Sequence, residues 1–217
     1  MNHFDVAIIG LGPAGSMAAL LLESYGMKVL CIDKERDIYN LPRAVTISDQ
    51  GFRMSQLVGI DEIYLKNSTI LGGAYFSDKN LEIIGGSIDL QDFISANGWP
   101  PSSMFHQPYT DREIRNKLES SKVEIILEHE FISLNQNQES VSFKTINLKN
   151  QKETEFTSRY LIGSDGGSSA VRKQLDIQQE DLNYNRDWVV IDVELNNPDK
   201  LGDKFCLLYT SPSPRDR

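Results

Sequence analysis

The sequence has few of the residues that build metal centres and disulfide frameworks. Its only two cysteines, Cys31 and Cys206, form no Cys-x-x-Cys pair. The three histidines, His3, His106 and His129, are scattered without the spacing of metal ligands. We therefore expect no bound metal and no disulfide.

The chain also lacks long apolar runs and an excess of positive charge. No hydrophobic stretch approaches the roughly 20 residues of a transmembrane helix, and the N-terminal MNHFDVAIIG lacks the basic and then apolar regions of a signal peptide. Lysine and arginine number 22 against 31 aspartates and glutamates, whereas nucleic-acid binders need clustered positive charge. We expect a cytoplasmic protein that binds neither membranes nor nucleic acid.

The last residues, 206–217, depart from the pattern before them. Their sequence, CLLYTSPSPRDR, resembles the translation of an adapter used in preparing DNA sequencing libraries. A genuine Ser/Pro-rich disordered tail is the alternative. We interpret 206–217 as a non-native tail, with the authentic reading frame lost near Phe205, which leaves the length of the native protein open.

What the sequence does have is a nucleotide-binding pattern at its start. The run FDVAIIG, 4–10, is typical of a buried parallel strand, and AGSMAALLLES, 14–24, predicts a helix that Gly26 ends. A second buried strand, KVLCID, 28–33, ends in Asp33. Together these segments predict a βαβ unit.

The glycines between the first strand and the helix have distinct roles. Gly10 permits the tight turn, Gly12 lets the main chain approach a pyrophosphate, and Gly15 lets helix and strand pack closely. Pro13 suits the first helical position, and the helix N-terminus offers unpaired N–H groups to an anion. A turn that serves only strand–helix packing is the alternative.

Asp33 adds the expected carboxylate to this pattern. It follows Gly15 at nearly the distance of about 20 residues at which an acidic side chain accepts hydrogen bonds from ribose hydroxyls. A free carboxylate there would repel a 2′-phosphate, so the first site favours FAD or NAD over NADP. The residues predicted to contact the nucleotide here are Gly10, Gly12, Pro13, Ala14, Gly15, Asp33 and Lys34.

After Asp33 the simple alternation of strands and helices is interrupted. An irregular stretch, 34–52, leads to a short helical segment up to residue 65 and to two strands, 69–78 and 81–88, of an inserted sheet. A helix is predicted near 109–121, with Thr110 and Glu113 at capping-box spacing. Residues 123–148 alternate as an antiparallel meander, and 155–163 returns as a strand.

A second glycine-rich turn, GSDGGSSAVR, follows at 163–172. Gly163 and Gly166 allow the backbone to turn sharply, and Ser168 or Ser169 can cap a helix that contains Arg172. The Arg172 side chain would then reach phosphate oxygens or hold Asp165 in place. A plain Asp-Gly turn with a surface arginine is the alternative.

Four stretches carry a resemblance to a known family: GLGPAG at 10–15, LPRAVTISDQGFR at 41–53, MFHQP at 104–108 and LIGSDGGSSAVR at 161–172; WVVIDVEL at 188–195 is similar in kind. The chain resembles the FAD-dependent aromatic hydroxylases, which are single-component flavoprotein monooxygenases, and most of all their 3-(3-hydroxyphenyl)propionate hydroxylase-like branch. No segment after Arg172 matches the family's third fingerprint, a Gly-Asp pair that leads into a helix. The resemblance therefore covers the N-terminal portion of such an enzyme.

The resemblance implies an α/β fold, with a Rossmann-like FAD-binding unit on a parallel sheet and an inserted antiparallel sheet. It assigns 1–72 and 105–175 to the FAD-binding domain. It assigns 73–104 and 176–205 to strands of a partial substrate domain. The remaining C-terminal half would be missing, and with it any catalytic residues.

The resemblance also implies a reaction: NAD(P)H reduces FAD, and a flavin C4a-hydroperoxide formed with O₂ hydroxylates a small phenolic substrate. It places Arg43 near the flavin, Gln107 on its ribityl chain, and Asp165, Gly166 and Arg172 in a second fingerprint for FAD and NAD(P)H. The fragment alone is expected to be inactive, and a homodimer is one assembly of the full-length form. A non-catalytic FAD- or nucleotide-binding fragment and another FAD-dependent oxidoreductase of the same fold are the alternatives.

Overall fold

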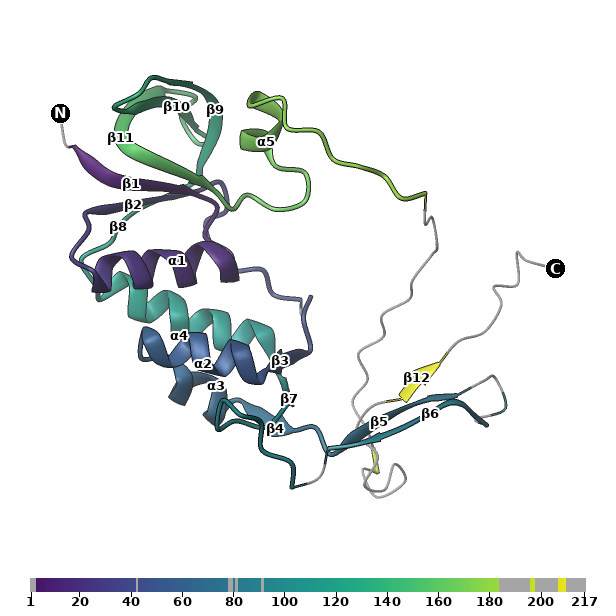
Figure 1. The fold of residues 1–217 in the computed structure, drawn as a ribbon. Helices are drawn as coiled ribbons and strands as arrows, with labels where there is room; N and C mark the ends of the chain where they lie inside the picture. Colours follow the sequence, from purple (N-terminus) through teal and green to yellow (C-terminus); the bar gives the residue numbers. More distant parts are fainter. Residues whose placement is uncertain are drawn as a thin grey trace. The chain divides into compact units, whose positions relative to one another are not determined.

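The computed structural model describes residues 3–41, 43–77, 80, 82–90, 92–183, 196–197 and 207–209 (Figure 1). The chain divides into two compact units. Unit 1 comprises Met1–Val45, Met54–Asn67 and His106–Glu180, and unit 2 comprises Thr46–Arg53, Ser68–Phe105 and Asp181–Arg217. The stretch 188–195, which carries part of the resemblance, lies outside the described residues, as does Cys206.

Unit 1 is built on one six-stranded sheet with the order β8-β2-β1-β11-β10-β9. Its strands are β1 (Phe4–Ile9), β2 (Val29–Asp33), β8 (Glu124–Leu127), β9 (His129–Gln136), β10 (Val141–Asn147) and β11 (Glu153–Gly163). The β8, β2, β1 and β11 strands pair in parallel, whereas β9, β10 and β11 form an antiparallel meander. The long β11 belongs to both the parallel and the antiparallel parts of the sheet, because Ser158 pairs with Phe4 of β1 and with Val141 of β10.

The prediction that residues 123–148 form an antiparallel meander is wrong for the first strand of that segment. Residues Glu124–Leu127 pair in parallel with β2 instead. Their continuous apolar run, Ile125 to Leu127, is typical of a parallel strand rather than a half-exposed one. Glu128 then adopts φ 60°, in the left-handed region, between β8 and β9.

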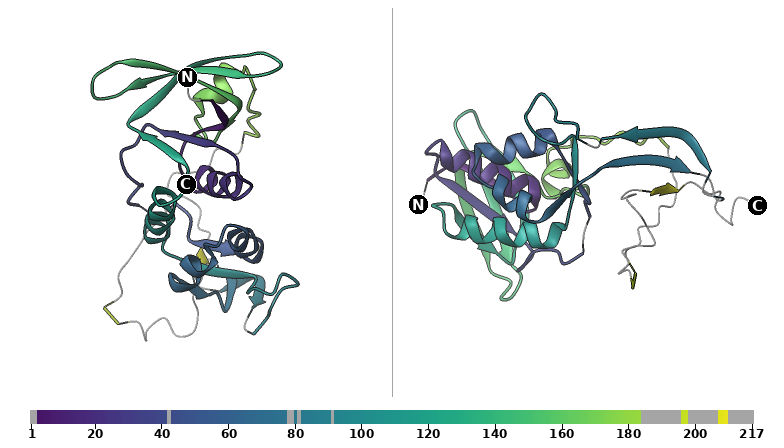
Figure 2. Two further views of the ribbon diagram at one scale, coloured as in Figure 1. Left: turned by 90° about the vertical axis from the view of Figure 1, so that its left-hand side faces the viewer. Right: turned by 90° about the horizontal axis from the view of Figure 1, so that it is seen from below.

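Helices and meander sandwich the parallel strands of unit 1. The α1 helix (Pro13–Ser24) packs beside α4 (Gln107–Glu119) on one face, and the meander covers the other face (Figures 1 and 2). The shorter helices are α2 (Asp49–Leu57), which runs from unit 2 into unit 1, α3 (Asp61–Lys66) and α5 (Ala170–Gln174). The core on the meander side is formed by buried Phe4, Ala7, Ile9, Leu30, Ile32, Phe131, Leu134, Phe143 and Val171.

The capping box predicted for α4 is wrong. The helix begins at Gln107, with His106 as its N-cap and Pro108 in its first turn. Proline suits that position because the first N–H groups of a helix have no partner to lose. Thr110 therefore lies inside the helix, fully buried, and its hydroxyl donates to the His106 carbonyl at 3.3 Å.

Unit 2 contains two small three-stranded sheets. One is antiparallel, in the order β3-β7-β4, and consists of β3 (Thr46–Ser48), β7 (Ser102–Phe105) and β4 (Ser68–Ile70). The other pairs β5 (Gly73–Ser77) with β6 (Ile83–Asp89) in a hairpin, and β12 (Leu207–Tyr209) joins β5 in parallel. The stretch predicted to be irregular thus contains β3 and the start of α2.

The structure confirms an α/β fold in which a βαβ unit on parallel strands is joined by antiparallel sheet. Among the described residues, no helix is both long and apolar enough to cross a membrane.

Candidate functional site

The first glycine-rich turn connects β1 to α1. Gly10 adopts φ +95°, and a Cβ there would lie 2.5 Å from the Ser164 carbonyl oxygen. A Cβ at Gly15 would overlap the Gly10 carbonyl oxygen. Backbone crowding therefore requires glycine at both positions, and it brings the first turn against the second.

Gly12 is different, because a Cβ at this position would have no atom within 4 Å. It is the N-cap of α1, and Gly12, Pro13 and Ala14 are all exposed. The helix has no side-chain cap and no acidic residue in its first turn. Its N-terminal N–H groups and the positive end of its dipole thus face open space, which suits an anionic group.

Asp33 lies at the end of β2, next to this turn. Its Oδ2 accepts a hydrogen bond from the Leu11 N–H at 2.6 Å, and its Oδ1 accepts one from the Glu35 N–H at 2.8 Å. Each carboxylate oxygen can accept a further bond, so a ribose hydroxyl fits as an additional donor. Lys34 is exposed beside it.

Arg115, on α4, reaches the same turn although sequence reasoning missed it. The side chain is only 5% exposed, and its Nη2 donates to the Leu11 carbonyl at 3.3 Å. Its Nε is buried with no hydrogen-bond partner among the described residues. A buried cation with an unpaired donor is costly unless an acceptor arrives, so this arginine also fits an anionic cofactor.

Gln107 and Arg43 are brought together, 64 residues apart in the chain. The Gln107 Oε1 accepts hydrogen bonds from the backbone N–H groups of Arg43 and Ala44, both at 2.8 Å. The guanidinium of Arg43 lies over the Tyr39 ring, 3.9 Å from its centroid. An ion pair between Asp37 and Arg112 of α4, at 2.5 Å, holds the same loop.

The Gln107 Nε2 donates in turn to Asp111 Oδ2 at 3.1 Å. Burial raises the pKa of Asp111 from its ordinary value, while the hydrogen bond from Gln107 and the charge of Arg115 oppose that rise. Asp111 had no sequence signal beyond its position four residues after Gln107 on one helix face.

The second turn precedes α5 and uses its own side chains to cap that helix. Asp165 Oδ1 accepts from the Ser169 hydroxyl at 2.5 Å, and Oδ2 accepts from the Ala170 and Val171 N–H groups. Of the two serines considered, Ser169 is the N-cap, and its Oγ accepts from the Arg172 N–H. Gly166 supplies the positive φ of +86° in the turn.

The Arg172 guanidinium does not hold Asp165. Its Nη1 donates to the Gly167 carbonyl at 2.8 Å and to Gln179 Oε1 at 2.7 Å. It therefore joins the second turn to the chain that follows α5.

Ser164 links the two turns directly. Because β11 pairs with β1, Gly163 lies opposite Ile9. The Ser164 N–H donates to the Ile9 carbonyl at 2.8 Å, and its hydroxyl lies 2.7 Å from the Gly10 carbonyl oxygen. The structure thus assembles both turns, Asp33 and Arg115 at the carboxyl ends of neighbouring parallel strands, where ligands bind in open α/β sheets.

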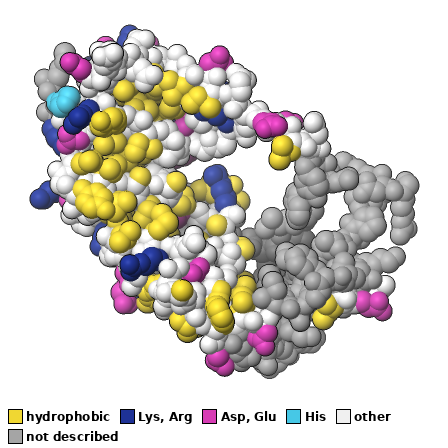
Figure 3. Space-filling model, viewed as in Figure 1, with side chains coloured by type: hydrophobic (Ala, Val, Ile, Leu, Met, Phe, Trp, Pro, Cys, Tyr) yellow, Lys and Arg dark blue, Asp and Glu magenta, His cyan; other side chains and the backbone are white. Residues whose placement is uncertain are grey.

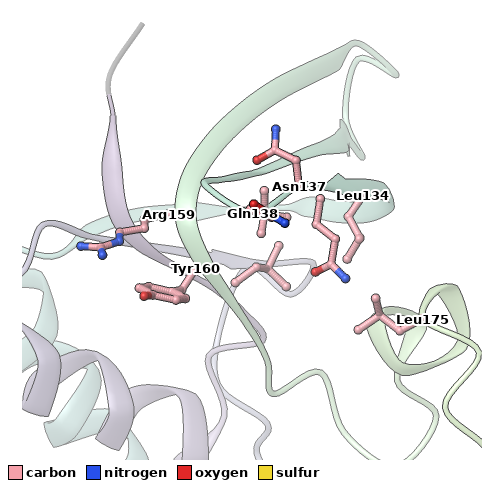
Figure 4. Close-up of a pocket in the computed structure, with 9 residues that line it drawn as sticks. Leu134, Asn137, Gln138, Arg159, Tyr160 and Leu175 are labelled. Carbon is pink, nitrogen blue, oxygen red and sulfur yellow. The ribbon is translucent and has the colours of Figure 1, made fainter.

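A cavity of about 270 Å³ lies elsewhere in unit 1, between the meander and Leu175 (Figure 4). Its lining includes Leu134, Gln138 and Tyr160 but none of the predicted site residues. In the view of Figure 3, hydrophobic side chains extend over much of unit 1. The cavity is therefore separate from the two glycine-rich turns.

The family model described as "FAD binding domain" matches residues 3–215. The chain is 31% identical over 213 residues to a 3-(3-hydroxy-phenyl)propionate/3-hydroxycinnamic acid hydroxylase of Burkholderia vietnamiensis, covering 94% of this chain and 32% of the relative. It is 30% identical to the corresponding hydroxylase of Shigella sonnei, covering 91% of this chain and 35% of the relative. The chain thus spans about a third of the length of these curated relatives.

Solved structures share the fold. The p-nitrophenol 4-monooxygenase PnpA of Pseudomonas putida superposes with a TM-score of 0.71 at 21% identity, over 81% of this chain and 44% of that one. The anhydrotetracycline hydroxylase OxyS of Streptomyces rimosus gives 0.70 at 24% identity, over 82% of this chain and 34% of that one. The match of the family model over nearly the whole chain shows that the chain belongs to the FAD binding domain family found in aromatic-hydroxylase-like flavoprotein monooxygenases.

Proposed function

We propose that this chain is the FAD-binding portion of an NAD(P)H-dependent monooxygenase that hydroxylates a small phenolic substrate with O₂. The open N-terminus of α1 is the observation that carries the proposal. It presents unpaired N–H groups beside exposed Gly12, with Asp33 and buried Arg115 next to it. Names of the curated relatives support an aromatic hydroxylase.

The chain's own residues would bind FAD in distinct ways. The N–H groups at Gly12, Ala14 and Gly15 would donate to the pyrophosphate, with Pro13 starting the helix. Arg115 would turn its unpaired Nε toward the same negative charge. Asp33 would accept from the ribose hydroxyls, and exposed Lys34 would lie beside them.

Arg43 and Gln107 would act at the flavin end. Both accepting positions of the Gln107 oxygen are used by the Arg43 loop, and one Nε2 hydrogen is used by Asp111. Any contact of Gln107 with the ribityl chain is therefore a donation from its second Nε2 hydrogen. When bound, FAD would supply the redox chemistry between NAD(P)H and O₂.

The second turn would contribute by position rather than by direct charge. The Asp165 carboxylate is engaged in capping α5, so Asp165, Gly166 and Arg172 would shape the loop against which FAD and NAD(P)H are held. We assign 1–72 and 105–175 to FAD binding and 73–104 and 176–205 to part of a substrate domain, with 206–217 as a non-native tail.

The first test is FAD binding by the 217-residue chain. We expect quenching of flavin fluorescence on titration, and about tenfold or greater weakening in Arg115→Met, since a buried charge–phosphate contact is removed. Arg159→Met is the control, because it removes an exposed arginine of β11 that lines the separate cavity. Equal FAD affinities for wild type and both variants would contradict the proposed role of Arg115 in FAD binding.

The second test addresses the reaction. The chain covers about a third of its curated relatives, so we propose that alone it binds FAD without hydroxylating. NAD(P)H oxidation and mass spectrometry of products with 3-(3-hydroxyphenyl)propionate would be compared for this chain and for a fusion to the remaining two thirds of a relative. Hydroxylated product from the fusion supports the proposal, whereas FAD reduction without any product favours another FAD-dependent oxidoreductase.

A further inference from the structure

We propose that Asp111 is a positioning residue that fixes the orientation of the Gln107 amide and thereby holds the Arg43 loop for the cofactor. The inference rests on the proposed FAD site and deepens it. It assigns a role to a side chain that neither glycine-rich turn contains.

The starting point is the side-chain amide of Gln107, which links the first turn of α4 to the Arg43 loop. Gln107 is only 8% exposed at the start of α4. Its Oε1 accepts two backbone N–H groups, of Arg43 and Ala44, at 2.8 Å each. Its Nε2 donates to Asp111 Oδ2 at 3.1 Å, one helical turn away.

The two ends of a glutamine amide are chemically different, although they have nearly the same shape. The Arg43 loop presents two donors, and these need the oxygen end. If the amide turned over, its NH₂ group would face two N–H groups, and the loop would lose both hydrogen bonds. An ionised carboxylate only accepts hydrogen bonds, so Asp111 requires the NH₂ end and selects the same orientation that the loop needs.

Because the site is buried, a wrongly oriented amide would be energetically costly. Gln107 is buried and Asp111 is half-buried, so water replaces lost partners poorly, and an unsatisfied polar group there is costly. The loop is otherwise exposed at Arg43, Ala44 and Val45. The buried Gln107 amide thus holds an exposed segment in place, and Asp111 determines which end of the amide faces that segment.

An exchange of the two functional groups tests this inference. In Gln107→Glu, two carboxylates face each other. In Asp111→Asn, an amide oxygen can still accept from Gln107. In the double variant, the carboxylate introduced at position 107 accepts from the loop with one oxygen and from the amide NH₂ group introduced at position 111 with the other. The polarity of the pair is then reversed but satisfied.

Hydrogen–deuterium exchange at the backbone amides of Arg43 and Ala44, measured without FAD, directly tests their hydrogen bonds to Gln107. We expect Gln107→Glu to speed exchange about tenfold, consistent with the loss of one or two buried hydrogen bonds. Asp111→Asn should change it less than about threefold. The double variant should return to within about threefold of wild type, and FAD affinity should follow the same order.

Glu119→Gln, an exposed carboxylate change on the same helix, is the control and should alter neither readout. A double variant that exchanges as fast as Gln107→Glu overturns the inference. If Gln107→Glu does not fold, Asp111→Ala replaces it, and unchanged exchange at Arg43 and Ala44 in that variant also overturns the inference. If wild type binds no FAD while the exchange pattern holds, the proposed function fails but the role of Asp111 in orienting the amide stands.

Discussion

The two glycine-rich turns look alike in sequence but leave their helices in opposite states. At the first turn, α1 has no side-chain cap, and exposed Gly12 has empty space where a Cβ would be. At the second turn, the Asp165 carboxylate and the Ser169 hydroxyl already occupy the N-terminal N–H groups of α5. The first turn is therefore available to an external anion, whereas the second is closed by its own side chains.

The difference shows that a glycine-rich turn before a helix does not by itself make an anion site. What decides the matter is whether a side chain caps the helix. The second turn instead braces the first, since the Ser164 N–H and hydroxyl contact the carbonyls of Ile9 and Gly10. One turn would bind the phosphate, and its neighbour would hold that turn in shape.

Asp165→Ala should have the largest effect, because it removes the cap that closes the second turn. Three hydrogen bonds to a charged acceptor are lost, and we expect the free energy of unfolding to fall by about 2–3 kcal/mol. Urea denaturation followed by circular dichroism measures this. Glu155→Ala, which removes an exposed carboxylate from β11, should cost much less, and equal losses would show that the cap contributes little.

Gly12→Ala and Gly167→Ala form a matched pair, one in each turn. Neither added Cβ would have an atom within 4 Å, so both variants should fold normally. We expect Gly12→Ala to weaken FAD binding about tenfold, or about 1.4 kcal/mol, because the methyl group enters the space that the pyrophosphate would occupy. Gly167→Ala should leave the affinity nearly unchanged. Similar losses in a fluorescence titration would mean that the two turns are not distinguished by the ligand.

Ser164→Ala should have the smallest effect, since it removes one hydroxyl and leaves the backbone contact with Ile9. We expect a loss of about 1 kcal/mol of stability, together with a modest loss of FAD affinity. Thermal melting with and without FAD separates the loss of stability from the loss of FAD affinity. A loss of affinity with no change in the melting temperature of the free protein would mean that Ser164 acts on the ligand rather than on the first turn.

Much of the site could be predicted from the sequence, because its main parts are local. The turn from Gly10 to Gly15, the strand that ends in Asp33 and the cap at Ser169 depend on short-range backbone rules. Position along the chain could not identify Arg115, since its burial and its contact with Leu11 arise from the packing of α4 beside α1.

The errors in the fold have the same origin. The sequence pattern places Glu124–Leu127 within the meander, because the true partner of this strand, β2, lies far away along the chain. Thr110 and Glu113 match a local helix-start pattern, but Pro108 has already started the helix. Local patterns identify elements reliably, whereas pairing partners and buried polar contacts are decided by the tertiary structure.

The pairing of β1 with β11 also dictates when the site can form during synthesis. The Ser164 hydroxyl and its Ile9 partner are separated by 155 positions, so the ribosome makes the first turn long before it makes the strand that supports it. Contacts between distant segments slow folding, because the long intervening loop must first be closed. The N-terminal turn is therefore translated early and supported late, so at the proposed site FAD would bind with full affinity only after synthesis has passed Ser164.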